Sequence, residues 1–346
     1  MTFNFFGNGK YFFSCIILLL LASCQNADKK RILEENLKAD SISILLNLPE
    51  LKAVNSKLLE DPNSGDLYNK RALIYTSIKE YTAAANDAKR AIKIDSTLPA
   101  YYNTLIDAYF AQNNTRKAKD LLELVEKKFP DNTEALLKSA ELYFLVMQYQ
   151  KAINYTNKAL KVDVSLAKAY YLKGSIYRES GDTAKAITSL QTATEQDNQY
   201  EDAFFDLGIL YAAKKNPLGP EYYNSALRIN PTNENTRYAR AKLLQDIGKT
   251  DEAIAEYDAL LVKNKRCDNC CYNVGAIYLE IKKDNKKALA YFTRAIGINP
   301  NYAEAYFARA YTYSKMGDRE RAKQDYNSCL ELEPNYEPAI EGLNKL

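Results

Sequence analysis

Three cysteines close together in the C-terminal half are the residues best suited to chemistry. Cys267, Cys270 and Cys271 belong to the segment Cys-Asp-Asn-Cys-Cys. Such thiols could bind a metal ion, act as a Cys-x-x-Cys redox pair, form a structural disulfide or stay free. A metal site would need a fourth ligand, and the chain has no histidine to supply it. A redox pair usually stands at a helix start after a β-strand, and no strand is predicted here. A structural disulfide and free thiols remain.

The other residue types argue against catalytic and cofactor chemistry. Without histidine there can be no Ser-His-Asp triad and no histidine general acid or base. The phosphate-binding motifs GxxxxGK(S/T) and GxGxxG are absent, and the carboxylates are scattered along amphipathic segments. Lys and Arg total 47 against 44 Asp and Glu, a net charge of +3, which is too balanced for binding nucleic acid by phosphate neutralisation. We therefore expect no enzyme activity, cofactor, metal, small-molecule substrate or nucleic-acid partner.

Residues 1–23 are typical of an export signal. An apolar run of 12 residues, Tyr11 to Ala22, follows Lys10. A membrane-spanning helix needs about 20 such residues, so the run is too short for a stable anchor. The run ends in Leu21-Ala22-Ser23-Cys24. An ordinary secretory signal cleaved nearby is the alternative to a lipoprotein signal.

The segment 21–24 resembles the lipobox of bacterial lipoproteins. In that family the signal peptide is removed before the cysteine, which then carries a thioether-linked diacylglycerol and usually an N-acyl chain. The resemblance implies that Cys24 is the mature N-terminal residue and the site of lipid attachment, and several acyl chains anchor a protein stably. Because Gln25 and not an aspartate follows Cys24, it also implies the outer membrane, with the periplasmic face favoured over the cell surface. Residues 24–39 are polar and are interpreted as a tether.

Most of the remaining chain repeats with a period near 34 residues. The eight units follow one another without gaps: 65–98, 99–132, 133–166, 167–200, 201–233, 234–267, 268–302 and 303–336. Residues 40–64 are interpreted as an N-terminal capping half-repeat, and residues 337–346 as a C-terminal capping helix.

Each unit carries the same residue types at the same offsets from its first residue. Most units have a small residue at offset 8, a tyrosine at offset 11 and small residues at offsets 20 and 27. Offsets 4, 8 and 11 share one stripe of a first helix, and offsets 20, 24 and 27 share one stripe of a second. Small residues let two antiparallel helices pack closely, and the tyrosine fills the space beside them. Gly181, Gly248 and Gly317 fall at the turn, where a left-handed helix cap is expected.

This pattern resembles the tetratricopeptide repeat. The last unit, AEAYFARAYTYSKMGDRERAKQDYNSCLELEPNY, matches nearly every position of that family, and the resemblance covers about 272 of the 346 residues. It implies an all-α fold, an α-solenoid with a right-handed superhelix of about eight helix-turn-helix repeats, preceded by the lipoprotein signal peptide. Stacked neighbouring repeats would bury the apolar faces that a single pair cannot bury.

The unit 201–233 departs from the pattern. Its segment Asn216-Pro217-Leu218-Gly219-Pro220 should delay and shorten the second helix. Aromatic residues also occupy offset 24 only from this unit onward, at Tyr223, Tyr257, Phe292 and Tyr326. We interpret the array as two halves of four repeats with a softer seam in this unit.

Five aromatic residues are the candidate partner-binding site. In the family that this chain resembles, offsets 2, 5, 9, 12 and 13 of the first helices line a concave groove. Offset 5 is aromatic in five consecutive units: Tyr171, Phe205, Tyr238, Tyr272 and Phe307. Aromatic side chains offer a large contact area at low entropy cost, which suits a bound peptide. The alternative is that these rings pack against neighbouring repeats and only shape the wall.

The groove lacks the clamp for C-terminal carboxylates used by chaperone-binding relatives. The first unit has Asn69 and Leu73 where that clamp needs Lys and Asn. The charged residues along the groove are of both signs, so no single-charge track is predicted. A receptor for chaperone tails is therefore rejected.

The repeat register assigns different positions to the clustered cysteines. Cys271 is at offset 4, where other units place core aromatics such as Tyr306, so it should face the core, as should Cys329 at offset 27. Cys270 lies about 100° round the helix from Cys271, nearer the incoming loop that contains Cys267. Asp268 is available to cap the helix start. This geometry favours a Cys267–Cys270 disulfide that acts as a local staple and not as a catalytic pair.

Together these features predict a non-enzymatic, lipid-anchored scaffold that binds protein or peptide partners in its groove. By resemblance, such lipoproteins serve envelope assembly, secretion or cell-wall machinery. The alternative is a glycan-binding or cell-wall-degrading envelope lipoprotein in which the repeats are an accessory module. That reading needs paired carboxylates or a saccharide platform outside the repeats, and none is evident in the sequence.

Overall fold

The structure, a computed structural model, describes residues 48–346. The predicted signal peptide, the lipid site Cys24, the tether and residues 40–47 of the predicted capping segment lie outside the described residues. Within residues 48–346 every regular element is a helix, so the predicted all-α fold of repeated helix pairs is confirmed.

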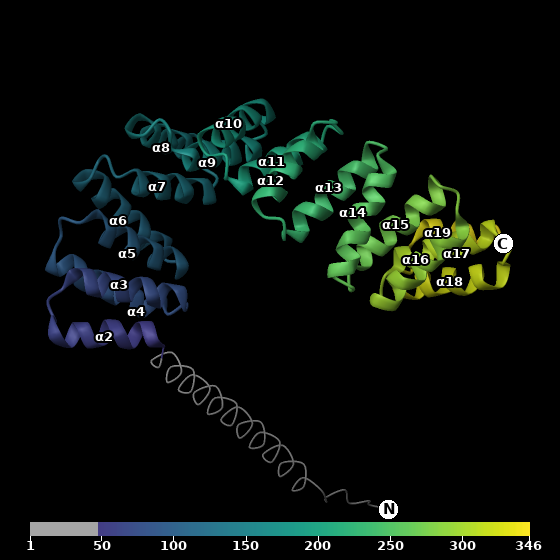
Figure 1. The fold of residues 1–346 in the computed structure, drawn as a ribbon, viewed down its shortest axis with the longest axis horizontal. Helices are drawn as coiled ribbons and strands as arrows, with labels where there is room; N and C mark the ends of the chain where they lie inside the picture. Colours follow the sequence, from purple (N-terminus) through teal and green to yellow (C-terminus); the bar gives the residue numbers. More distant parts are fainter. Residues whose placement is uncertain (1–47) are drawn as a thin grey trace, which may run out of the picture. The chain divides into compact units, whose positions relative to one another are not determined.

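The helices follow one another as antiparallel pairs within each compact unit of the chain (Figure 1). Each first helix begins at the first residue of a predicted repeat. The elements are α2 (Pro49–Glu60), α3 (Gly65–Ser77), α4 (Tyr81–Ile94), α5 (Pro99–Ala111), α6 (Thr115–Lys128), α7 (Thr133–Leu145), α8 (Tyr149–Val162), α9 (Ala167–Glu179), α10 (Thr183–Gln196), α11 (Glu201–Ala212), α12 (Gly219–Ile229), α13 (Glu234–Asp246), α14 (Thr250–Lys263), α15 (Asp268–Glu280), α16 (Asn285–Ile298), α17 (Ala303–Lys315), α18 (Arg319–Leu332) and α19 (Glu337–Asn344).

The chain divides into two compact units, one up to Leu142 and one from Tyr143 to Leu346. The division falls inside the third predicted repeat, so the predicted seam in unit 201–233 is in the wrong place. The expected local effect of Pro217, Gly219 and Pro220 is present, because α12 has 11 residues where the other second helices have 14. The shortened α12 nevertheless packs against both α11 and α13, which keeps the second unit continuous there.

The turn between the two helices of a repeat requires one residue with a left-handed backbone. Gly181, Gly248 and Gly317 adopt φ values of 87°, 81° and 79°, as predicted for these glycines. Five other repeats place a non-glycine residue in the same conformation: Lys79, Asn113, Met147, Lys215 and Lys283. Glycine relieves the strain of this conformation, but the repeat tolerates a side chain there.

Large rings at offset 24 fill the space above small residues at offset 8 in the second unit. Tyr223, Tyr257, Phe292 and Tyr326 are at most 2% exposed. A Cβ atom on Gly208 would lie 2.4 Å from the Tyr223 ring, and one on Gly275 would lie 2.7 Å from the Phe292 ring. The aromatic residues that the sequence shows from unit 201–233 onward are therefore core rings matched to small partners.

The tyrosines at offset 11 are less buried than the sequence indicates. Tyr177 and Tyr278 are only half-buried, and Tyr278 stacks on Tyr291 of the second helix with ring centroids 5.7 Å apart. In these two repeats offset 11 therefore faces the second helix at the edge of the core, whereas Tyr109 at the same offset is buried.

A recurring ion pair joins the helices of some repeats and links them to the preceding repeat. The Arg309 guanidinium donates to both carboxylate oxygens of Asp325, at 2.7 and 2.8 Å, and to Thr293 of the previous repeat at 3.2 Å. These hydrogen bonds raise the pKa of Arg309. Arg71 with Asp87 and Arg240 with Glu256 form the same pairing, 16 residues apart. This 16-residue spacing was not among the features predicted from the sequence.

Candidate binding groove

The structure places the five candidate rings at the same position of five first helices, all in the second unit. Tyr171, Phe205, Tyr238, Tyr272 and Phe307 lie in α9, α11, α13, α15 and α17, and each is half-buried. We call this set the aromatic ladder.

Exposed side chains flank the ladder along the same helical stripe. At offset 2, Asp202, Asn235 and Asn269 are exposed, and at offset 9, Ile209 and Tyr311 are 37% and 41% exposed. Residues at offsets 2, 5 and 9 lie on one side of a helix. The ladder therefore belongs to a surface that a partner could reach, which we call the ladder face.

Each ladder ring also packs against a ring of the protein. Phe205, Tyr238, Tyr272 and Phe307 lie 5.7–6.1 Å from the buried offset-24 ring of their own repeat. Aromatic pairs at such distances are stabilising. One face of each ladder ring is therefore covered by another ring of the protein, and the exposed part of the ladder ring is available to a partner.

Further tyrosines extend the ladder, and the sequence analysis missed them. Each of these tyrosines directly precedes a helix: Tyr200 precedes α11, Tyr302 precedes α17 and Tyr336 precedes α19. The ring centroids are 5.0 Å apart for Tyr200 and Tyr171, 5.2 Å for Tyr302 and Tyr272, and 5.3 Å for Tyr336 and Phe307. Burial is the main cause that raises the pKa of Tyr336 to about 12. The sequence pattern that could have predicted these ring pairs is a second tyrosine about 30 residues after the ladder residue.

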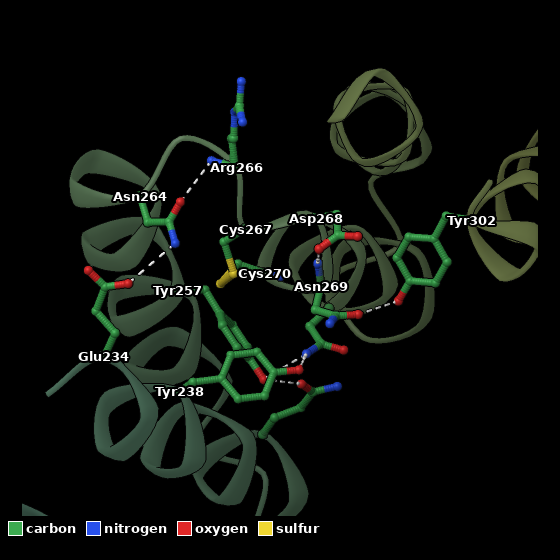
Figure 2. Close-up of a disulfide and its surroundings, with 12 residues drawn as sticks. Glu234, Tyr238, Tyr257, Asn264, Arg266, Cys267, Asp268, Asn269, Cys270 and Tyr302 are labelled. Carbon is green, nitrogen blue, oxygen red and sulfur yellow. Dashed lines mark hydrogen bonds between the residues drawn. A yellow bond between two sulfur atoms is a disulfide. The ribbon is translucent and has the colours of Figure 1, made fainter. Parts of the chain in front are cut away.

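A cavity of about 190 Å³ opens beside the central ladder ring. Its walls are Glu234, Asn235, Tyr238, Leu260, Asn264, Cys267 and Asn269. The Tyr238 hydroxyl accepts a hydrogen bond of 3.0 Å from Asn273, which also donates to the Tyr257 hydroxyl at 3.1 Å (Figure 2). The hydrogen bond from Asn273 holds the Tyr238 ring in the wall of the cavity, where the ring could contact a side chain of a bound partner.

A buried carboxylate lies near Tyr171, the first ring of the ladder. Asp206 of α11 is 6% exposed and pairs with Arg178 of α9 at 2.7 Å. Burial raises the pKa of Asp206, and Arg178 counteracts part of this rise. Tyr171 is close enough that Asp206 contributes to the raised pKa of its hydroxyl, after burial itself. The ion pair links the first helices of two successive repeats.

The clustered cysteines occupy the start of α15. Cys267 and Cys270 form a disulfide with their Cα atoms 5.2 Å apart. Cys271 and Cys329 are buried free thiols, and burial raises the pKa of both, that of Cys329 to about 11. Cys267 itself caps the helix by accepting from the Cys270 amide at 3.2 Å, so the expectation that Asp268 would provide the cap is wrong.

The described residues were also compared with the requirements of a metal site and of a membrane span. Between residues 48 and 346, no cluster of three or more potential ligands among Cys, Asp and Glu could hold a metal ion. In the same range, no helix has the length and apolar character needed to cross a bilayer. The ladder face offers ring surfaces, amides and paired charges, which suit recognition of a polypeptide.

Family models for tetratricopeptide repeats match the chain along most of its repeated part. Models described as "Tetratricopeptide repeat" match residues 65–97, 105–132, 238–303 and 303–336, and one described as "TPR repeat" matches residues 174–215. These matches together cover more than half of the 346 residues.

The chain is similar to known proteins and to solved structures of tetratricopeptide repeats. The Superkiller complex protein 3 of Homo sapiens is 24% identical over 343 residues, which are 91% of this chain and 19% of that protein. The UDP-N-acetylglucosamine--peptide N-acetylglucosaminyltransferase of Giardia intestinalis is 42% identical over 64 residues, which are 18% of this chain and 4% of that protein. The chain thus spans a small part of either relative.

Among the similar solved structures is the C-terminal part of a TPR repeat-containing protein from Cytophaga hutchinsonii. It aligns with a TM-score of 0.62 at 19% identity and covers 70% of this chain and 99% of that one. At this identity the likeness concerns the fold.

Proposed function

The chain belongs to the tetratricopeptide repeat family, and on that premise we propose that it is a lipid-anchored scaffold that holds a protein or peptide partner on its ladder face. Repeats of this family form protein-interaction surfaces, and the repeats account for residues 65–336 of this chain. The finer parts of the proposal are the anchor at Cys24, the outer membrane with its periplasmic face, and service to an envelope assembly, secretion or cell-wall machinery.

The aromatic ladder carries the binding part of the proposal. One half-buried ring recurs in each of five successive first helices, and exposed residues lie on both sides of Phe205 and Tyr238. Rings that are already packed on one side lose little conformational freedom when a partner covers the other side. An extended peptide lying across α9 to α17 could therefore contact one ring per repeat.

The anchor rests on residues 21–24 of the sequence. Small residues between an apolar run and Cys24 provide the spacing of a lipoprotein signal. With the array tethered at one end, a partner would be held close to the membrane. Because no His, metal cluster or phosphate motif accompanies the ladder in the described residues, we propose binding without chemistry.

Replacing Tyr272 with alanine tests the binding part. We expect Tyr272→Ala to weaken affinity capture of the partner from detergent-solubilised membranes by about 1–3 kcal/mol, the range for a central aromatic contact. The same change at Tyr171, Phe205, Tyr238 or Phe307 should weaken capture in the same direction. Quantitative mass spectrometry of the captured proteins measures the effect.

Tyr291→Ala is the matched control. Tyr291 belongs to the same repeat and is also half-buried, but it lies on the second helix α16 and donates to Asp258 at 3.0 Å. We expect this variant to have a lower melting temperature than the parent protein and still to capture the partner. If Tyr272→Ala lowers the melting temperature as Tyr291→Ala does and leaves capture intact, the ladder only packs the repeats together.

A further inference from the structure

The two cysteines of the Cys267–Cys270 disulfide differ in burial. Cys267 is half-buried and forms part of the wall of the cavity beside Tyr238 (Figure 2). Cys270 is fully buried in the first turn of α15, as is Cys271 next to it. A thiolate arriving in the cavity could therefore reach the sulfur of Cys267, while the helix shields that of Cys270.

The helix start also favours a negative charge on the exposed sulfur. Cys267 is the N-cap of the 13-residue helix α15, and the Cys270 amide points at its Sγ atom at 3.2 Å. Free amides and the helix dipole stabilise a thiolate at this position. The adjacent acid, Asp268, is engaged elsewhere, because its two carboxylate oxygens accept from Asn269 at 2.9 Å and from Asn299 at 2.8 Å.

We propose that Cys267–Cys270 is a thiol–disulfide exchange site whose substrate is a small-molecule thiol. The cavity of about 190 Å³ suits a small thiol better than a folded protein. A reactive pair was not expected from the sequence, because no β-strand is predicted before Cys267. Exchange needs an accessible sulfur and a stabilised thiolate, and the start of α15 provides both without a strand.

The exchange consists of two successive thiol–disulfide reactions. A thiolate of the small thiol attacks Cys267 Sγ, the bond to Cys270 breaks, and the electron pair leaves on Cys270 Sγ, which takes a proton from water. A second thiolate attacks the small thiol's sulfur in the mixed disulfide and releases Cys267 as a thiolate. The protein disulfide is thereby reduced to two thiols, and two small thiols are oxidised to their disulfide. One disulfide per chain reacts, so the process requires no enzymatic turnover.

The site is joined to the ladder face by hydrogen bonds. Asn269, between the two cysteines, accepts from the Tyr302 hydroxyl at 2.7 Å, and the Tyr302 ring lies 5.2 Å from the ladder residue Tyr272. Cys267 shares the cavity wall with Tyr238. Exchange at Cys267 would therefore change the surroundings of two ladder rings, although the chemistry itself does not depend on the ladder's role in binding.

Single-cysteine chemistry tests the proposal in two full-length variants. Cys270→Ser leaves Cys267 as a free thiol, and Cys267→Ser leaves Cys270 free. We expect 5,5′-dithiobis(2-nitrobenzoate) to label Cys267 about tenfold faster or more than it labels Cys270, because accessibility and the helix start both favour Cys267. Release of thionitrobenzoate gives the rate, and peptide mass spectrometry gives the position. Cys271 and Cys329, buried thiols with raised pKa values, serve as internal controls that react only after denaturation.

The unmodified protein provides the second measurement. Native protein incubated with reduced glutathione and quenched with N-ethylmaleimide should carry glutathione on Cys267 and not on Cys270. Equal labelling rates in the two variants, or a native disulfide that glutathione opens only in denaturant, would overturn the proposal and leave the disulfide as a static staple. Circular dichroism identifies a variant that fails to fold, in which case the native glutathione experiment decides.

Discussion

Replacing Tyr257 with alanine is expected to lower the free energy of unfolding of the second unit by about 3–5 kcal/mol, the usual cost of removing a fully buried large ring. Tyr257 has no exposed surface and lies 5.7 Å from the ladder residue Tyr238. Its hydroxyl accepts from Asn273 and donates to Gln245 at 3.2 Å. Because neighbouring repeats stabilise one another, the loss should extend beyond the mutated repeat. Urea denaturation followed by circular dichroism measures it.

Tyr257→Phe is the matched control, since it keeps the ring and removes the hydroxyl. It should cost about 1 kcal/mol, the typical net contribution of a hydrogen bond, and Asn273 would keep its bond to Tyr238. Tyr278→Ala removes a half-buried ring, and its loss in free energy of unfolding should lie between those of Tyr257→Phe and Tyr257→Ala. A Tyr257→Ala variant as stable as Tyr257→Phe would show that the offset-24 rings are not the centre of the core.

Replacing Cys24 with alanine is expected to move the protein from the membrane fraction to the soluble fraction, or to leave it unprocessed. Without the sulfur no diacylglycerol can be attached, and the affinity of acyl chains for the bilayer, about 0.8 kcal/mol per buried CH₂ group, is lost. Fractionation with immunoblotting and the intact mass of the N-terminal peptide measure both outcomes.

Cys15→Ala is the control for this experiment, because Cys15 lies in the predicted signal peptide and leaves with it. That variant should be processed and membrane-bound like the parent. If Cys24→Ala is also processed and remains in the membrane fraction, Cys24 is not the lipid site, and the anchoring part of the proposed function is wrong.

The register of the repeats could be predicted because it depends on residue size at fixed spacing. Ala303 begins α17, and Gly65 begins α3, at the predicted first residues of their units. Close approach of two helices favours a small residue at offset 8, and every unit except 99–132, which has Ile106 there, carries one. The effect of Pro217 and Pro220 on α12 was also predictable, since proline limits where a helix can start.

Contacts between repeats could not be read in the same way. The sequence shows that Tyr171 and Tyr200 are aromatic, but only the packing of α9 on the start of α11 brings the rings within 5.0 Å. Periodicity also does not show which stripe is central, and so it does not distinguish the half-buried Tyr278 at offset 11 from the fully buried Tyr257 at offset 24. The cap at Cys267 was not predicted because cysteine is not among the usual N-cap residues, although α15 begins at the predicted residue, Asp268.

Site-specific photo-crosslinking from the ladder face tests the central claim most directly. Benzoylphenylalanine would be placed at Tyr311 or Ile209, which are exposed on that face, and at Ala290, which is exposed on the second helix α16. These positions leave every ladder ring intact. The account predicts that membrane-bound protein forms a crosslink to the same partner from positions 311 and 209 and none from position 290. A partner that crosslinks from position 290 and from neither ladder-face position would contradict it.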